Sequence, residues 1–326
     1  MLVLWTGLAG FVHQANFVEE LGLEYQHTIA SAVSLSGIGL HTGVPVTLRL
    51  APAPAGTGVV FKRTDLDNFP IEALERNVAR VAYATSLMKK GVLISTTEHL
   101  LSALAASGVD NVFAEIDNLE LPIADGSALP FAKMIAKAGL KRQRARRTFA
   151  RILKPVEVVE GAKRIAVHPS ATFRVTYRIA FPHPLIGEQS VEFTPGRGNY
   201  AVEIAPARTF GFLEEVEMLR KSGLIQGGSL ENAVVLTRDG VLNPEGVRFP
   251  DEFCRHKILD LVGDLALLGH PLIGHVMAER AGHAMHAALV EKLLRNKSSW
   301  ELVHSDAHES PNPRATMPAL ATQQPA

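Results

Sequence analysis

The stretch His256-Lys257-Ile258-Leu259-Asp260-Leu261-Val262-Gly263-Asp264 most narrows what this chain can fold into. Its Leu, Ile and Val residues recur as they do on a helix with one apolar side. Residues four apart lie one turn above each other, so His256 and Asp260 share a face and Asp264 follows one turn further along. An imidazole nitrogen and a carboxylate oxygen on one rigid face are potential zinc ligands. A catalytic zinc site needs a third protein ligand, a position for water and a base.

The adjacent residues Glu98 and His99 supply both missing groups. They belong to a stretch from Ser95 to about Gly108 that has the pattern of an amphipathic helix, on which neighbouring side chains point about 100° apart. His99 could then bind the metal while Glu98 takes a proton from a water molecule beside it. An alternative stays open, because Ser95 with Glu98 three residues later also fits a capping box.

Two further residues, His283 and Cys254, have side chains that can also bind a metal ion. His283, in Gly282-His283-Ala284, is interpreted as a fourth metal ligand or a general acid, although a lone histidine after glycine is more often a cap or a core residue. Cys254 precedes His256 by two residues on roughly the opposite helical side, so we expect it to pack rather than bind metal. The chain has no Gly-rich phosphate loop and no Gly-x-Ser-x-Gly elbow.

Length and composition bound the class of protein. The 326 residues suggest about two domains at roughly 150 residues each. Lys and Arg total 33 and balance 33 Asp and Glu, so nothing favours a nucleic-acid partner. The single cysteine excludes an internal disulfide and fits a reducing compartment. No apolar stretch reaches the roughly 18 residues of a spanning helix, and residues 1–12 lack the basic residues of a signal peptide. A loosely held extension or a misplaced start codon is expected there.

In each half of the chain, predicted strands come first and predicted helices follow them. The first half has predicted strands within 27–50, at 59–63, within 78–94 and at 111–116, and helices at about 95–108 and 130–139. The second has strands at 151–159, 163–168 and 172–180, a helix near Pro206 or beyond, and the His256 helix. This order favours an α+β fold with two layered domains over alternating βαβ units. We expect an extension at 1–24, domains at 25–142 and 149–303, and a flexible tail at 304–326.

Two segments allow more than one interpretation. The basic run at 141–147 is interpreted as a solvated linker between the domains, with nucleic-acid binding as the weaker alternative because no aromatic residues are interleaved. Residues 211–236 look like an insertion in which Phe212, Leu213, Val216 and Leu219 lie on one helical side. Ordinary core packing is the default interpretation of that apolar stripe.

Several motifs, in one order from about His27 to Val303, together resemble the zinc-dependent UDP-3-O-acyl-N-acetylglucosamine deacetylases. That family catalyses the committed step of lipid A biosynthesis, within lipopolysaccharide and lipid metabolism, in Gram-negative bacteria. The motifs are Gly37-Ile38-Gly39-Leu40-His41-Thr42-Gly43, Thr97-Glu98-His99-Leu100, Pro122-Ile123-Ala124-Asp125-Gly126-Ser127, Ala207-Arg208-Thr209-Phe210-Gly211-Phe212, Phe253-Cys254-Arg255-His256-Lys257 to Asp264, and Gly282-His283-Ala284.

The resemblance implies a cytoplasmic zinc hydrolase with two β-α-α-β sandwich domains and the active site between them. It also implies the role of each group in the site. Zn²⁺ would be held by His99, His256 and Asp260, with Glu98 as general base, His283 protonating the leaving nitrogen, Asp264 orienting that imidazole and Thr209 binding the oxyanion. Lys257 would point away from the metal face and meet polar groups of the substrate.

Substrate contacts are implied with less detail. They would come from Phe181, Phe210, Leu213, Val216, Val235 and Arg280. Phe181 and Arg280 would contact uridine and diphosphate, and residues 211–236 would form the apolar passage of the 3-O-acyl chain, in place of the core interpretation. The partner would be this acylated UDP-sugar alone, without nucleic acid, with a peripheral membrane contact through the acyl chain, and the protein would be a monomer.

Two departures from the family pattern and two rival functions stay open. The first two dozen residues have no counterpart, and the usual asparagine after Gly282-His283-Ala284 is replaced by His286-Ala287. That replacement is expected to affect substrate contacts rather than the metal. The rivals are a zinc amidohydrolase of the same fold acting on another N-acyl sugar, and a non-catalytic protein with a structural zinc. The second lacks a convincing fourth ligand.

Overall fold

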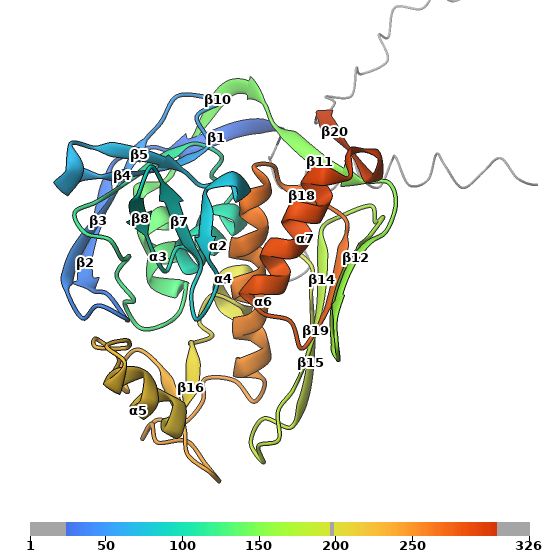
Figure 1. The fold of residues 1–326 in the computed structure, drawn as a ribbon. Coiled ribbons are helices and arrows are strands. Elements are labelled where there is room, and N and C mark those ends of the chain that lie inside the picture. The colour runs from blue at the N-terminus through green and yellow to red at the C-terminus, as the bar shows by residue number, and fades with distance from the viewer. Residues whose placement is uncertain (1–23, 196–198, 305–326) are drawn as a thin grey trace, which may run out of the picture.

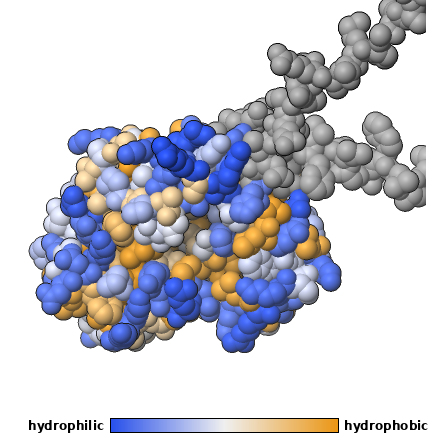
Figure 2. Space-filling model, turned by 90° about the horizontal axis from the view of Figure 1, so that it is seen from above, coloured by the Kyte–Doolittle hydropathy of each residue, from blue (hydrophilic) through white to orange (hydrophobic). Residues whose placement is uncertain are grey.

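The computed structural model describes residues 24–195 and 199–304, which form a mixed α+β fold with several sheets. The expected extension and tail lie outside this part, apart from Glu24 and His304. None of the helices in the described ranges is long and apolar enough to cross a membrane. Seen from above in Figure 2, hydrophilic residues cover much of the surface, and apolar residues gather in separate patches.

The first half is built on a five-stranded sheet in which only β4 and β9 run parallel. In its second strand, Val46, Leu48 and Leu50 are buried while Arg49 is exposed, which is the alternation expected of a half-buried strand. In spatial order the strands are β2 (Val33–Ile38), β3 (Pro45–Pro52), β9 (Val112–Ile116), β4 (Val59–Arg63) and β5 (Phe69–Glu72).

The second half repeats this topology. Only β14 and β19 run parallel, and the strand that comes last in the sequence again takes the central place. In spatial order the strands are β12 (Val156–Glu160), β13 (Lys163–His168), β19 (His275–Glu279), β14 (Arg174–Ala180) and β15 (Glu188–Phe193).

The main helices lie between the two large sheets in Figure 1. Helix α3 contacts β2, α6 contacts β14 and β15, and α7 contacts β12 and β13, while α2 packs against α6. Their apolar faces join one core, which includes Leu100, Leu104 and Leu259. The contact between α2 and α6 therefore joins the two halves and places their polar residues together. The bounds are α2 (Glu98–Ala106), α3 (Leu129–Ala138), α6 (Glu252–Leu265) and α7 (His283–Arg295).

Gly263 lets α2 and α6 approach closely. A Cβ at this position would lie 2.1 Å from the backbone oxygen of Glu98, and backbone cannot move as a flexible side chain can. We expect Gly263→Ala to lower the free energy of unfolding by about 1–3 kcal/mol, the usual cost of overpacking. Denaturant unfolding measures the change, and Gly240→Ala is the control because its Cβ would lie 3.7 Å from the nearest atom. Equal losses in the two variants would contradict the close approach.

Smaller elements complete the fold. The paired strands are β1 (Tyr25–Ile29) with β10 (Leu140–Arg146); β18 (Leu272–Ile273), β11 (Thr148–Ile152) and β20 (Trp300–His304); β6 (Val78–Arg80), β7 (Ser86–Lys89) and β8 (Val92–Ile94); and β16 (Phe210–Phe212) with β17 (Val234–Leu236). The remaining helices are α4 (Tyr200–Glu203), α5 (Leu213–Lys221) and the 3-10 turns Thr64–Leu66, Glu75–Asn77, Ala266–Leu268 and Lys297–Ser299.

The basic run is not a linker, because residues 140–146 form β10 and pair with β1. Its expected exposure to solvent is confirmed for Lys141, Arg142 and Arg144. The run is ordered by contacts that its sequence did not indicate. The guanidinium of Arg142 lies 3.5 Å from the centre of the Tyr25 ring, and the buried Arg147 donates a 2.7 Å hydrogen bond from Nε to Asp110. Cation–π and ion-pair contacts thus hold charged residues that composition alone places in solvent.

The insertion at 211–236 contains a helix that begins at Leu213, beyond Pro206. The prediction that Phe212 belongs to its apolar side is wrong, because Phe212 is the last residue of β16. It lies at one end of the molecule in Figure 1, next to β16. Leu219 and Val235 are buried, whereas Leu213 and Val216 are only half-buried. The apolar stripe is therefore not uniformly core.

Candidate active site

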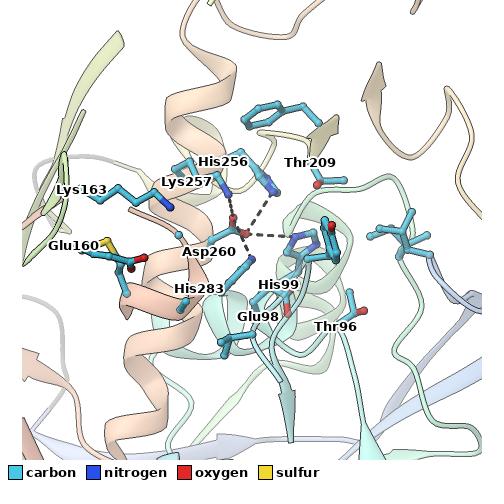
Figure 3. Close-up of a pocket in the computed structure, with 18 residues that line it drawn as sticks. Thr96, Glu98, His99, Glu160, Lys163, Thr209, His256, Lys257, Asp260 and His283 are labelled. Carbon is cyan, nitrogen blue, oxygen red and sulfur yellow. Dashed lines mark hydrogen bonds and ion pairs between the residues drawn. The ribbon is translucent and has the colours of Figure 1, made fainter. Parts of the chain in front are cut away.

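A cavity of about 410 Å³ opens where α2, α6 and the start of α7 meet. Glu98 and His99 come from the first turn of α2, while His256, Lys257 and Asp260 come from α6. His283 is the first residue of α7. Figure 3 shows their side chains converging from these three helices. The long-range helix contact thus brings together the two motifs that the sequence had placed on separate helices.

His99, His256 and Asp260 form a compact, buried group. Asp260 Oδ1 lies 3.4 Å from His256 Nε2 and 3.7 Å from His99 Nε2. The first distance confirms that residues four apart on α6 share a face. The three ligand atoms lie within 4.8 Å of one another, as the donors of a tetrahedral zinc site do.

The chemistry of this group fits a metal ion. Among the described residues, the buried Oδ1 of Asp260 has no hydrogen-bond partner, which is costly without a ligand. The Nδ1 of His256 lies 3.1 Å from the Ala207 carbonyl; because a carbonyl only accepts, Nδ1 carries the proton and Nε2 keeps its lone pair for a metal. Burial lowers the pKa of His256 and lowers that of His99 to about 3, so both rings are neutral, as ligands must be.

Cys254 does not belong to this group, as expected from its helical side. Its buried Sγ donates to the Tyr177 carbonyl at 3.2 Å. Burial raises its pKa to about 12, which disfavours the thiolate that would bind metal. Within the described part of the chain, the group around Asp260 therefore offers three protein ligands and no cysteine. That number is typical of catalytic rather than structural zinc.

Glu98 lies beside the ligands as a buried carboxyl group. Its Oε2 accepts a 3.0 Å hydrogen bond from the backbone N–H of Thr85. Burial raises its pKa to about 7, close to the value that suits a general base near neutral pH. The capping-box alternative is wrong: α2 begins at Glu98, no side chain caps it, and the Ser95 hydroxyl pairs with Ser86 instead.

His283 and Asp264 form a hydrogen-bonded pair on another side of the cavity. Nδ1 of His283 lies 2.7 Å from Asp264 Oδ2; because a carboxylate only accepts, this nitrogen carries a proton. Burial opposes charge on the imidazole, but Asp264 and Asp260 outweigh it and raise the pKa of His283 to about 9. Burial likewise opposes charge on Asp264, yet His283 lowers the pKa of that carboxyl to about 2. The pair is thus a protonated acid with its counter-ion.

The expectation that His286 affects substrate contacts is wrong. This side chain is fully buried and is not among the residues that line the cavity. Its Nδ1 lies 2.8 Å from Asp264 Oδ2 and its Nε2 lies 3.0 Å from the Tyr177 hydroxyl. It lies about one turn of α7 beyond His283, and both imidazoles contact the same carboxylate oxygen of Asp264. Only the packing of α6 against α7 could reveal this position.

Thr209, Phe210 and Lys257 also line the cavity. The prediction that Lys257 points away from the metal face is wrong, because its Nζ donates to Asp260 Oδ2 at 3.0 Å. The long side chain of Lys257 is flexible enough to reach Asp260, three residues further along α6. Its ammonium can thus neutralise the ligand carboxylate as well as meet an anionic substrate.

The other residues that were predicted to contact the substrate do not line this cavity. They are Phe181, Leu213, Val216, Val235 and Arg280. Phe181 lies one layer further out, with its ring centre 5.9 Å from that of Phe210 and 6.0 Å from that of Phe212. Aromatic side chains therefore continue from the cavity toward the insertion.

Several lining residues escaped the sequence analysis. Glu160 and Lys163 flank the turn between β12 and β13, and Figure 3 shows Lys163 extending its side chain toward the centre of the site. A single lysine after a glycine turn has no distinguishing pattern, so no sequence signal could have found it. Four other lining residues were also missed: Val81, Tyr83, Thr96 and Met285. Another four belong to motifs that carried the family resemblance but had no predicted role: Leu40, Ile123, Gly282 and Ala284.

Comparison with known proteins shows the family of this chain. Residues 26–295 match the family model LpxC, described as UDP-3-O-acyl N-acetylglycosamine deacetylase. A UDP-3-O-acyl-N-acetylglucosamine deacetylase of Solibacter usitatus is 55% identical over 284 residues, covering 87% of this chain and 96% of that protein. Those of Syntrophotalea carbinolica and Myxococcus xanthus are 49% and 48% identical, covering 86% and 87% of this chain and 91% of each relative. The chain belongs to the family of zinc-dependent UDP-3-O-acyl-N-acetylglucosamine deacetylases.

Proposed function

We propose that this chain hydrolyses the N-acetyl group of UDP-3-O-acyl-N-acetylglucosamine, releasing acetate in the committed step of lipid A biosynthesis. The observation that supports this most directly is the placement of Glu98 and His283 beside the buried group of His99, His256 and Asp260. Amide hydrolysis needs a base for water and an acid for the leaving nitrogen, and both lie in one cavity.

When bound by His99, His256 and Asp260, zinc supplies a Lewis acid and lowers the pKa of water. Glu98, with its raised pKa, accepts the proton of the attacking water. The Thr209 hydroxyl donates a hydrogen bond to the oxygen that becomes negative on the acetyl carbon. His283 then gives its Nε2 proton to the glucosamine nitrogen while Asp264 holds its Nδ1 proton. The C–N bond breaks as that nitrogen becomes protonated.

The charged cavity wall suits the diphosphate of the substrate. Lys257 and Lys163 both line it, and ammonium groups bind phosphate oxygens as point charges. Phe181 and Arg280 would then meet the uridine and the diphosphate further out. We also propose that each half of the chain forms a β-α-α-β sandwich domain, at residues 25–142 and 149–303, with the active site between them.

The insertion would hold the 3-O-acyl chain. Phe210 lines the cavity and contacts Phe181, and Val216 packs against Gly211, whose Cβ would lie 3.4 Å from it. Together with Leu213 and Val235 these residues would make an apolar route away from the metal group. Each CH₂ of the chain buried there would contribute roughly 0.8 kcal/mol.

Charged replacements at Leu213 or Val235 are therefore expected to discriminate between substrates. Leu213→Glu should lower kcat/KM for the acylated UDP-sugar far more than for an analogue without the acyl chain, because only the former enters the route. The ratio of the two kcat/KM values in wild type and variant is the measurement. Met218→Glu, on the exposed side of α5, is the matched control. A parallel loss on both substrates would show that the stripe is structural.

The proposed function is tested by measuring acetate release before and after the metal is removed. We expect the zinc-loaded protein to release acetate from UDP-3-O-acyl-N-acetylglucosamine, and chelation to abolish release while the protein stays folded. The reason is that the apolar core shared by the two halves includes none of His99, His256 and Asp260. Release from a different N-acyl sugar but not from this substrate would favour the rival amidohydrolase. Unfolding on chelation would favour a structural zinc.

A further inference from the structure

We propose that Thr85 is a positioning residue, whose hydroxyl holds the acid pair Asp264–His283 in fixed geometry relative to the base Glu98. This inference rests on the proposed function, which assigns the acid and base roles. Thr85 lies in the loop that enters β7, is 1% exposed, and does not itself line the cavity.

The contacts of Thr85 reach both sides of the site. Its backbone N–H donates to Glu98 Oε2 at 3.0 Å, and its hydroxyl lies 2.6 Å from Asp264 Oδ1 and 3.2 Å from His283 Nδ1. Glu98 belongs to the first half of the chain, whereas Asp264 and His283 belong to the second. A single residue thus connects the base with the acid pair across the contact between the halves.

The hydrogen-bond capacity of a hydroxyl suits this place. It has one proton to donate, which the carboxylate of Asp264 accepts, and lone pairs that can accept from the protonated Nδ1 of His283. Oδ2 of Asp264 already accepts hydrogen bonds from His283 and His286. The hydroxyl of Thr85 donates to the other oxygen, Oδ1. Without it, the carboxylate can rotate, and the imidazole bonded to it follows.

The backbone of Thr85 is itself fixed by α2. Its carbonyl accepts hydrogen bonds from the N–H of Thr97 at 3.2 Å and from the Thr97 hydroxyl at 3.0 Å. The loop therefore moves with the first turn of α2, which carries Glu98. Because of this coupling, the Thr85 hydroxyl holds Asp264 and His283 at a fixed position relative to Glu98.

The experiment compares variants that differ by one hydroxyl: Thr85→Ser with Thr85→Ala, and wild type with Thr85→Val. Zinc-loaded protein is assayed for kcat and KM on UDP-3-O-acyl-N-acetylglucosamine. Loss of the hydroxyl should lower kcat about ten- to hundredfold, as loss of an orienting partner does, with KM and zinc content within about twofold of wild type. Thr85→Ser should keep most of kcat. A second readout is the low-field NMR signal of the His283 Nδ1 proton, which should shift or broaden in the alanine and valine variants only.

Thr28 provides the matched structural control. It is buried, and its hydroxyl accepts a 3.0 Å hydrogen bond from the N–H of Ala53, the residue that follows β3. Thr28→Val should lower the melting temperature without changing kcat. The inference is overturned if Thr85→Ala keeps the kcat of Thr85→Ser, or if Thr28→Val loses as much kcat as Thr85→Val. Failure of the proposed function looks different, because wild type itself would then release no acetate. Should Thr85→Val not fold, the serine and alanine pair decides.

Discussion

Replacing Glu98 with alanine is expected to lower kcat about 10²–10⁴-fold, the usual effect of removing a general base, while zinc stays bound. The three ligands are other residues, and none of them is hydrogen-bonded to Glu98. Burial raises the pKa of this carboxyl to about 7, so near neutral pH an appreciable fraction is ionised and still basic enough to take a proton from water. Loss of the carboxylate removes this acceptor from the cavity.

Acetate release by the zinc-loaded variant, together with its zinc content, measures this effect. Glu98→Gln is the matched variant, because it keeps the shape of the side chain and can still accept from the Thr85 N–H through its amide oxygen. Both variants should lose turnover to a similar degree. If glutamine retained near-wild-type kcat, Glu98 would be a packing residue and the base would have to be sought elsewhere.

The second large effect is expected on replacing Asp260, which lies one turn before Asp264 on α6. Asp260→Ala should reduce zinc affinity by more than the about 10–100-fold typical of an orienting partner, because it removes a ligand and leaves two histidines. Asp264→Ala should instead mainly lower kcat, since its carboxylate contacts His283, His286 and Thr85 rather than the metal group.

Zinc titration of the two variants, alongside steady-state kinetics, separates the two roles. Asp251→Ala is the control: this aspartate precedes α6 and pairs with Arg255 through a 2.6 Å contact, away from the cavity. It should change neither zinc affinity nor kcat appreciably. Equal losses of zinc affinity in Asp260→Ala and Asp264→Ala would mean that the ligand face of α6 has been assigned wrongly.

The local parts of this site could be predicted from the sequence. His256 and Asp260 share a face because the helical repeat is set by backbone geometry, whatever surrounds the helix. Adjacent Glu98 and His99 point in different directions for the same reason. The colinear motifs pointed to the family, which the relatives confirm. The apolar periodicity also predicted the two helices that carry these residues, α2 and α6.

Contacts between distant segments were decided only by the tertiary structure. The capping box and the solvated basic linker were locally reasonable, but Glu98 faces a cavity and the basic run pairs with β1. His286 and Thr85 meet Asp264 because α7 and the loop before β7 pack around α6, and neither residue has a pattern of its own in the chain. Short-range periodicity determines which side chains share a helix face. Which faces meet depends on burial of apolar surface by the whole chain. The close approach of α2 and α6 at Gly263 brings Glu98 and His99 to the side chains of α6.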